Sequence, residues 1–144
     1  MGYLPRRYLE LGANMVEIQR FLVAGQHQPV SHYCHAVRAG DRVWISGTVG
    51  IDADGNIPAD TVEQFRVAMS NLDAVLHATG GLACDIVKVT VFLTDIADRA
   101  RINPIREHYF GDHRPASTLV EVRALVLPEL KVEIEAEAVV SDDG

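Results

Sequence analysis

The fold is decided by a C-terminal stretch that reads HRPASTLVEV at residues 113–122 and KVEIEAEAVV at residues 131–140. Hydrophobic and polar side chains alternate in both runs, which is typical of β-strands with one buried face. In the first run, one face would carry Thr118, Val120, Val122 and Ala124, and the other Leu119, Glu121 and Arg123. In the second run, the inward residues would be Val132, Ile134, Ala136, Ala138 and Val140.

The two predicted strands are joined by a short segment around residues 127–130 that contains Pro128. We expect the strands to pair as a hairpin or to be near neighbours. Glu133, Glu135 and Glu137 would then lie on the face opposite the apolar one. Because exposed strand faces are usually polar, these glutamates indicate either a solvated surface or, at one position, the wall of a cleft.

Length and composition indicate a single globular domain. The chain has 144 residues, of which 48% are hydrophobic and 23% are charged. These values are ordinary for a globular protein, and the length is sufficient for one well-formed core. No apolar run approaches the roughly 20 residues of a membrane helix, and a basic start followed by an apolar segment is absent. We therefore expect neither a membrane span nor a secretory signal.

Charge and cysteine content exclude further classes of protein. The formal net charge of −7 argues against a nucleic-acid binder, which needs a basic surface. Cys34 and Cys84 have no metal-motif spacing, which indicates free thiols in a reduced, cytoplasmic setting. His32 and His35 flank Cys34, but no acidic residue lies at ligand spacing, so a metal site is not expected.

The remaining pattern predicts two helices and three further strands. The strands are expected within residues 16–23, 43–46 and 86–93, the last of them central because it is almost continuously apolar. A helix begins after Asp60 or Thr61 and ends at residues 79–81. Gly47, at the end of its strand, permits a close approach by another group.

The second helix and the N-terminus are less regular. The second helix is predicted within residues 98–110, with its main part starting near Asn103, Pro104 in its first turn and Gly111 at its end. Residues 1–14 would form either a short amphipathic helix ended by Gly12 or an extension that precedes a natural start at Met15. Residues 15–144 would form the single domain.

This order of elements predicts an α+β fold in which both helices cover one face of a mixed sheet. No further element within the chain is predicted to cover the other face. An uncovered apolar sheet face is usually buried against another copy of the same protein, so we expect a homo-oligomer.

Six segments, taken together in order and spacing, resemble the reactive-intermediate deaminase family, also called Rid or YjgF-type. They are YCHAV (33–37), GDRVWISG (40–47), DIVKVTVFLTD (85–95), YF (109–110), RPA (114–116) and VEIEA (132–136). The resemblance covers residues 15–140. It implies a chorismate-mutase-like α+β sandwich that assembles as a homotrimer, with the sheets closing into a central barrel and a pocket at each subunit boundary.

The resemblance also implies an activity and a set of site residues. Active members of the family hydrolyse enamines and imines to 2-keto acids and ammonia without a metal or other cofactor. By correspondence with their motifs, Tyr33 would lie in the pocket, and the backbone of Ser46 and Gly47 would face the substrate. Glu133 would position the attacking water.

One position departs from the family pattern. The deaminating branch has an arginine directly after the Pro-Ala pair, where it grips the substrate carboxylate through two hydrogen bonds, but this chain has Ser117. The loss of such a charged hydrogen bond costs about 1.5–3 kcal/mol. Ser117 and the nearby Arg114 remain candidate substrate-binding residues, although the position of Arg114 before Pro115 does not allow a simple replacement.

Imine hydrolysis requires a positioned water, a proton for the nitrogen and an acceptor for the proton of the water. Glu133, partly buried, could be the general base, and backbone N–H groups near Gly47 could bind an oxygen atom. Tyr33 is either a hydrogen-bond donor that closes the pocket or an aromatic residue of the subunit interface.

Three functions remain open: an imine or enamine hydrolase, a non-catalytic trimer that binds small metabolites in the same clefts, and a ribonuclease. The retention of Glu133 favours the first. The acidic charge disfavours the third.

Overall fold

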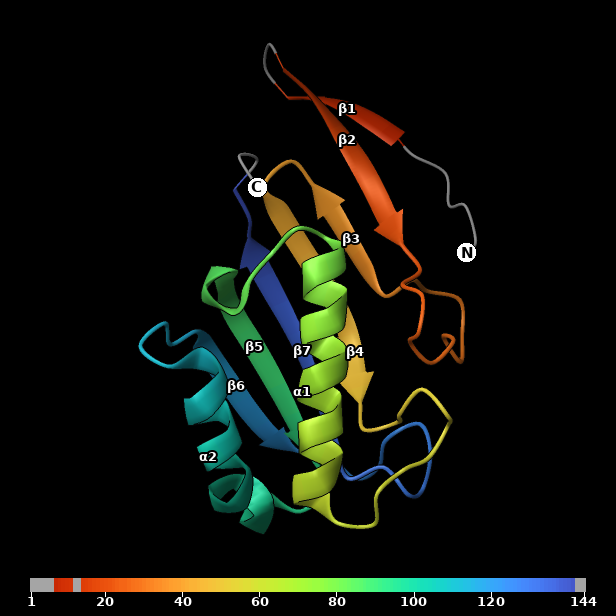
Figure 1. Ribbon diagram of the computed structural model, residues 1–144, viewed down its shortest axis with the longest axis vertical. Coiled ribbons are helices and arrows are strands. Elements are labelled where there is room, and N and C mark those ends of the chain that lie inside the picture. The colour runs from red at the N-terminus through yellow and green to blue at the C-terminus, as the bar shows by residue number, and fades with distance from the viewer. Residues whose placement is uncertain (1–6, 12–13, 142–144) are drawn as a thin grey trace.

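A seven-stranded mixed sheet carries two helices on one of its faces in the computed structural model, which describes residues 7–11 and 14–141 (Figure 1). The strands lie in the order β1-β2-β3-β4-β7-β5-β6, and every neighbouring pair is antiparallel except β5 and β6. The main elements are β1 (Arg7–Leu11), β2 (Asn14–Phe21), β3 (Ala36–Ala39), β4 (Arg42–Val49), α1 (Thr61–Ala78), β5 (Ile86–Leu93), α2 (Arg99–Phe110), β6 (Ala116–Glu121) and β7 (Val132–Val139). The predicted α+β layer arrangement is therefore confirmed.

Helix α1 packs on the middle of the sheet. Its first turn is capped as predicted, because the Asp60 carboxylate accepts a hydrogen bond from the backbone N–H of Val62 at 3.1 Å. Its buried apolar side chains recur at intervals of three or four residues, which places them on one stripe of the helix against β4 and β7. They are Phe65, Ala68, Met69, Leu72, Val75 and Leu76.

The alternation predicted for β7 is confirmed. Val132 and Ile134 are fully buried, and Glu135 and Glu137 on the opposite face are exposed. Burial of apolar side chains stabilises the fold by about 25 cal/mol per Å² of surface removed from water. The apolar face of β7 is therefore the face that packs against the helices.

Of the two arrangements expected for the C-terminal strands, the hairpin is wrong, and the strands are near neighbours with one strand between them. Strand β5 lies between β6 and β7, pairing parallel with β6 and antiparallel with β7. Helix α2 carries the chain from β5 back to the start of β6, and a helical crossover of this kind makes the two strands parallel. The faces of β6 are also reversed, since Leu119 packs against the core and Val120 is 38% exposed.

Helix α2 begins earlier than predicted. A short 3-10 turn at Ile96–Asp98 leads directly into Arg99, so Pro104 lies inside the helix. Proline lacks the N–H that would bond to the carbonyl of Ala100. The fully buried Ile102 anchors the first turns against the core, which offsets that loss.

The N-terminal part of the chain forms a strand where a helix was one expectation. Strand β1 pairs with β2 along its whole length, at the edge of the sheet (Figure 1). Met15 lies within β2. Gly12 and the rest of the predicted helix before Arg7 lie outside the described residues.

The face of the sheet opposite the helices carries exposed apolar side chains. Trp44 of β4 is 42% exposed, and Val139 of β7 is 45% exposed. They surround a shallow hollow together with Val87 and the charged side chains of Arg42 and Glu137. In Figure 1, α1 and α2 both lie on the other side of the sheet.

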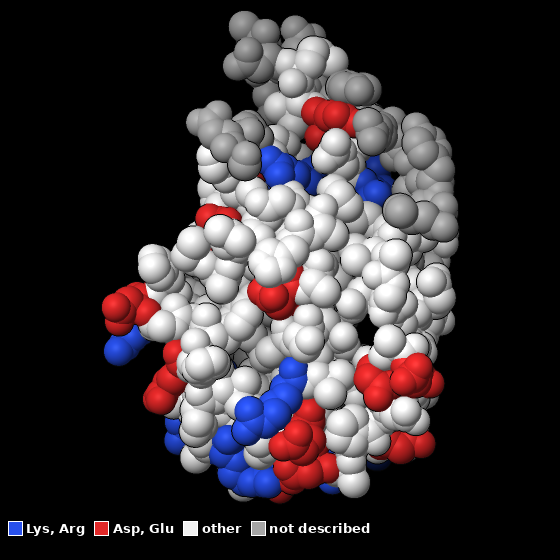
Figure 2. All heavy atoms as spheres, in the orientation of Figure 1, with Lys and Arg blue, Asp and Glu red and all other residues white. Residues whose placement is uncertain are grey.

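Charged side chains gather at the end of the molecule where α1 and α2 begin (Figure 2). There the Arg101 guanidinium of α2 bridges two carboxylates, Asp60 at 2.7 Å and Asp98 at 2.9 Å. This ion-pair group joins the starts of the two helices. No helix in the described part of the chain is long and apolar enough to cross a membrane.

Candidate functional site

The most constrained contact in the predicted site joins Gly47 of β4 to Glu133 of β7. The register of these two strands shifts between Ile45 and Thr48, because β4 contains one extra residue at this point. A Cβ atom on Gly47 would overlap the Glu133 carboxyl group. Glycine is therefore needed here for close approach, as the sequence predicted, and the group that approaches is the side chain of the candidate catalytic glutamate.

The Glu133 carboxyl group is half-buried, and its environment favours the protonated form. Burial raises its pKa above the ordinary value of 4.5, and the negative charge of Glu135 raises it further. When ionised, the carboxylate is consequently a stronger base than a solvated glutamate. That property suits a group that takes a proton from water.

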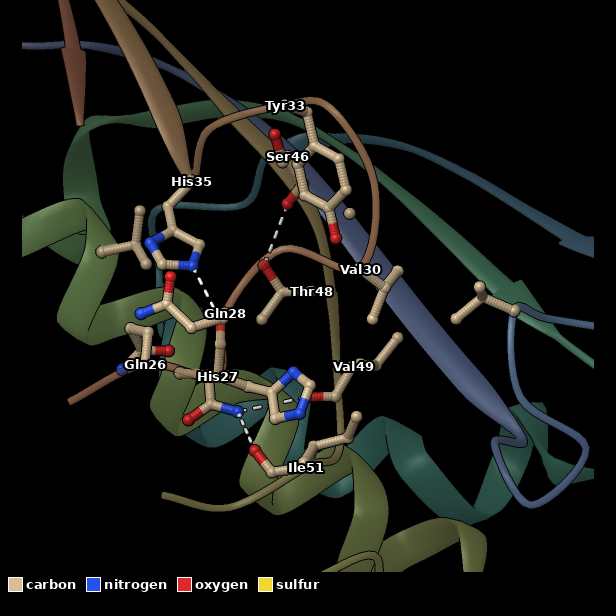
Figure 3. Close-up of a pocket in the computed structure, with 14 residues that line it drawn as sticks. Gln26, His27, Gln28, Val30, Tyr33, His35, Ser46, Thr48, Val49 and Ile51 are labelled. Carbon is tan, nitrogen blue, oxygen red and sulfur yellow. Dashed lines mark hydrogen bonds between the residues drawn. The ribbon is translucent and has the colours of Figure 1, made fainter. Parts of the chain in front are cut away.

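A cavity of about 80 Å³ lies on the other side of Gly47, between the end of β4, the loop of residues 22–35 and helix α1 (Figure 3). Tyr33, Ser46 and Gly47, all predicted site residues, line it together with Thr48 and His35. A cavity of this size in the single chain has room for several waters. Gly47 both lines the cavity and touches Glu133.

Ser46 holds the cavity wall in place. Its hydroxyl donates to the carbonyl of Cys34 at 2.6 Å, and its backbone N–H donates to the carbonyl of His35 at 3.0 Å. Its own carbonyl accepts a hydrogen bond from the Thr48 hydroxyl at 2.9 Å. The two donors of Ser46 are thus used within the chain, and the predicted substrate contact through its backbone would have to use another atom.

His35, which the sequence offered only as a possible metal ligand, lines the cavity. Its Nδ1 accepts a hydrogen bond from the N–H of Val23 at 2.9 Å, so Nε2 carries the proton and donates to the carbonyl of His27 at 2.9 Å. The imidazole therefore ties the end of the loop that leads to Tyr33 back to its start, and Figure 3 shows the bond to His27. A lone histidine in a loop gives no periodic signal, which explains why sequence reasoning missed this role.

Asn71 of α1 fixes the chain beyond β4. Its Nδ2 donates to the carbonyls of Val49 at 3.1 Å and Ile51 at 2.8 Å. Val49 is the last residue of β4 and Ile51 lies just beyond it, so the side-chain amide binds backbone carbonyls at the point where the strand ends. Helix α1 thereby positions the floor of the cavity.

Ser117 and Arg114, the other two predicted site residues, lie elsewhere in the chain. Ser117 is on β6, and its hydroxyl oxygen accepts a hydrogen bond from Nη2 of Arg106 at 2.8 Å. Arg114 and Arg106 line an open hollow of about 560 Å³ beside the end of α2. The predicted site therefore divides into two groups of residues, and strand β5 separates Ser117 on β6 from Glu133 on β7.

The chain is similar to known proteins in both sequence and structure. A family model described as Endoribonuclease L-PSP matches residues 24–140. The solved YjgF gene product from Escherichia coli superimposes with a TM-score of 0.78 at 34% identity, covering 84% of this chain and 98% of that one. The chain belongs to the Rid/YjgF family. The predicted family and its fold are confirmed.

Other Rid/YjgF proteins are similar over most of their length. The 2-iminobutanoate/2-iminopropanoate deaminase of Escherichia coli (strain K12) is 36% identical over 123 residues, which cover 81% of this chain and 95% of that protein. The RutC family protein PH0854 of Pyrococcus horikoshii is 36% identical over 111 residues, covering 76% and 87%. RidA from the Antarctic bacterium Psychrobacter superimposes with a TM-score of 0.81 at 31% identity, covering 85% and 99%.

Proposed function

We propose that this Rid/YjgF protein hydrolyses a reactive imine or enamine to a carbonyl compound and ammonia. The observation that carries the proposal is the half-buried Glu133 carboxyl group, held against Gly47 beside a cavity that Tyr33 also lines. The similarity to a deaminase of 2-iminobutanoate and 2-iminopropanoate over 81% of the chain supports the same class of reaction.

The chemistry follows from the needs of a C=N bond. A water oxygen attacks the imine carbon while the Glu133 carboxylate accepts the proton of that water. The protonated Glu133 carboxyl group returns this proton to the nitrogen, which gives the neutral carbinolamine. The hydroxyl proton of the carbinolamine then also passes to the nitrogen, the C–N bond breaks, and ammonia leaves as the C=O bond forms. An enamine first takes a proton on carbon to become the imine. The Tyr33 hydroxyl donates a hydrogen bond to the substrate from the opposite wall.

The reaction is proposed to take place in clefts between copies of the chain in a homotrimer. Glu133 lies on the face of the sheet that no helix covers, and exposed apolar side chains such as Trp44 and Val139 share that face. Burying them against a second copy would desolvate Glu133 further. The cavity at Gly47, which is small in one chain, would then gain a wall from the neighbouring copy.

The test generates imino acids in place with an amino-acid oxidase and traps them with semicarbazide. Wild-type protein is expected to reduce semicarbazone formation from small side chains such as that of 2-aminobutanoate, because hydrolysis competes with trapping. Glu133→Gln should lose this effect. If the wild type leaves semicarbazone formation unchanged for small, aromatic and acidic side chains alike, the hydrolase proposal is wrong.

The same purified protein can be tested for the two alternative functions. A non-catalytic metabolite binder would bind 2-oxo acids in calorimetry without changing semicarbazone formation. The family description names an endoribonuclease, so single-stranded RNA belongs in the test as well. We expect no cleavage, because the net charge is −7 and a basic surface of the kind that binds RNA is not expected on such an acidic chain.

A further inference from the structure

Arg106 of α2 is a half-buried cation that the rest of the described chain does not neutralise. Its one hydrogen bond to a described residue is the donation from Nη2 to the Ser117 hydroxyl at 2.8 Å, and none of the described carboxylates lies within ion-pair distance. Burial lowers the pKa of its guanidinium below the ordinary value for arginine. The charged guanidinium is therefore partly desolvated without a neutralising partner among the described residues.

A guanidinium has five N–H donors in a planar fork, and a serine hydroxyl oxygen satisfies one of them. Partly buried cations in proteins are normally matched by an anion, because unpaired burial is costly. The remaining donors of Arg106 are therefore available to a ligand with two acceptor oxygens side by side, which is the geometry of a carboxylate.

The surroundings of Arg106 leave room for such a ligand. The hollow beside it has a volume of about 560 Å³ and is also lined by Arg114 and Phe110. Two acidic residues line the same hollow, but Glu107 is held by the Asn103 amide at 2.9 Å, and Asp112 forms no ion pair with Arg106. The guanidinium of Arg106 stays open to the hollow.

We propose that Arg106 and Ser117 together bind the carboxylate of a 2-imino or 2-oxo acid. The Ser117 oxygen accepts from Arg106, so its own hydrogen is free to donate to one carboxylate oxygen, while the guanidinium donates to both. The positive charge of Arg114 lies in the same hollow. This assignment rests on the proposed deaminase function and supplies, from α2, the guanidinium that the family resemblance places at position 117.

The register of the sheet shows how this group relates to Glu133. Ser117 pairs with Val89 of β5, and Glu133 pairs with Phe92, three residues further along. Two strand spacings and three residues along the strand correspond to about 14 Å between Cα atoms. Ser117 shares the helix-covered face with the buried Val89, whereas Glu133 is on the opposite face.

A substrate of four or five carbons cannot span that separation through the sheet. The carboxylate-binding group of one copy would therefore act with the Glu133 of another, in the cleft between them. Arg106 is then a substrate-binding residue contributed across the boundary between copies.

Isothermal titration with 2-oxobutanoate, the oxo acid that 2-iminobutanoate yields on hydrolysis, tests the assignment on the intact protein. Arg106→Gln should raise Kd about 10- to 100-fold, as expected for the loss of charged hydrogen bonds. Arg106→Lys should bind with intermediate affinity, because it keeps the charge but loses the fork. Arg99→Gln, an exposed charge removal on the same helix, is the matched control and should bind like the wild type.

A double variant, Arg106→Ser with Ser117→Arg, moves the guanidinium from α2 to β6 and should restore binding. Thermal unfolding checks that each variant is folded. If Arg106→Gln does not fold, the affinities of Arg106→Lys and of the double variant test the inference instead. Unchanged affinity in Arg106→Gln would overturn the inference, as would a wild type that binds no 2-oxobutanoate at tens of millimolar.

Turnover separates this inference from the proposed function. Binding through Arg106 without any hydrolysis of imino acids would leave the carboxylate site standing and remove the deaminase. Hydrolysis of 2-iminobutanoate with the same kcat/KM in wild type and Arg106→Gln would support the deaminase function and overturn the role of Arg106.

Discussion

The carboxyl group of Glu133 lies so close to Gly47 that no other residue fits at position 47 without moving it. Gly47→Ala should therefore displace the carboxylate and destabilise the protein by about 1–3 kcal/mol, the usual cost of overpacking. Urea unfolding measures the change. In the double variant Gly47→Ala with Glu133→Ala the clash is gone, so most of the lost stability should return. Equal losses in the single and double variants would contradict the contact.

Replacing Glu133 by glutamine should remove the base while preserving size and shape. The expected loss in kcat for imine hydrolysis is about 10²- to 10⁴-fold. Glu137→Gln changes an exposed carboxylate on the same face of β7 and should retain full activity. Loss of activity in both variants to the same extent would assign the effect to the charge of the strand and not to Glu133.

The raised pKa of Glu133 has a consequence for stability. Between the ordinary glutamate pKa of 4.5 and the higher value in the folded state, the folded protein binds more protons than the unfolded chain, so stability falls as pH rises through that window. Glu133→Gln cannot ionise and avoids this loss. Its Tm should exceed that of the wild type at pH 7, and the difference should shrink below pH 4.5. A difference independent of pH would show that ionisation is not the cause.

His35 should control the loop that carries Tyr33. His35→Ala removes two hydrogen bonds, to the Val23 N–H and the His27 carbonyl. At about 0.5–1.5 kcal/mol each, the loss of stability should be about 1–3 kcal/mol, and hydrogen exchange at the Val23 amide should accelerate. His108→Ala, on the exposed side of α2, is the control and should change neither.

Trp44 tests the proposed assembly. A charge in the centre of an apolar contact between copies is costly to bury, so Trp44→Glu should shift the protein to a smaller species in light scattering. Leu82→Glu replaces a residue that is 57% exposed in the loop between α1 and β5 and should leave the molar mass unchanged. A wild type that is monomeric at micromolar concentration would contradict the assembly directly.

The elements that the sequence predicts correctly are those in which apolar side chains recur on a single buried face. The alternation of β7 and the periodic stripe of α1 both arise from direct packing against the core, and both are confirmed. Strand β3 was not predicted, because Ala36–Ala39 is short and its only fully buried side chain is an alanine. These four residues have no strong hydrophobic pattern, so the strand is defined by its pairing with β2 and β4.

Pairing between strands was less predictable than the strands themselves. The alternation of β6 is consistent with either face being buried, and the choice of Leu119 over Val120 depends on the parallel register with β5. Likewise, position 117 was recognised as unusual from the family pattern, but nothing in the sequence connects it to Arg106, eleven residues earlier. Such contacts across a crossover depend on how α2 lies on the sheet.

Strand β5, placed between β6 and β7, also determines how sites are counted. Ser117 and Glu133 belong to the same chain but to opposite faces, so under the proposed arrangement each chain contributes half of two different sites. A closed ring of copies then has as many complete sites as chains, whereas an open pair has only one. Catalytic capacity would scale with the number of boundaries between subunits, and closing the ring would itself create the last site.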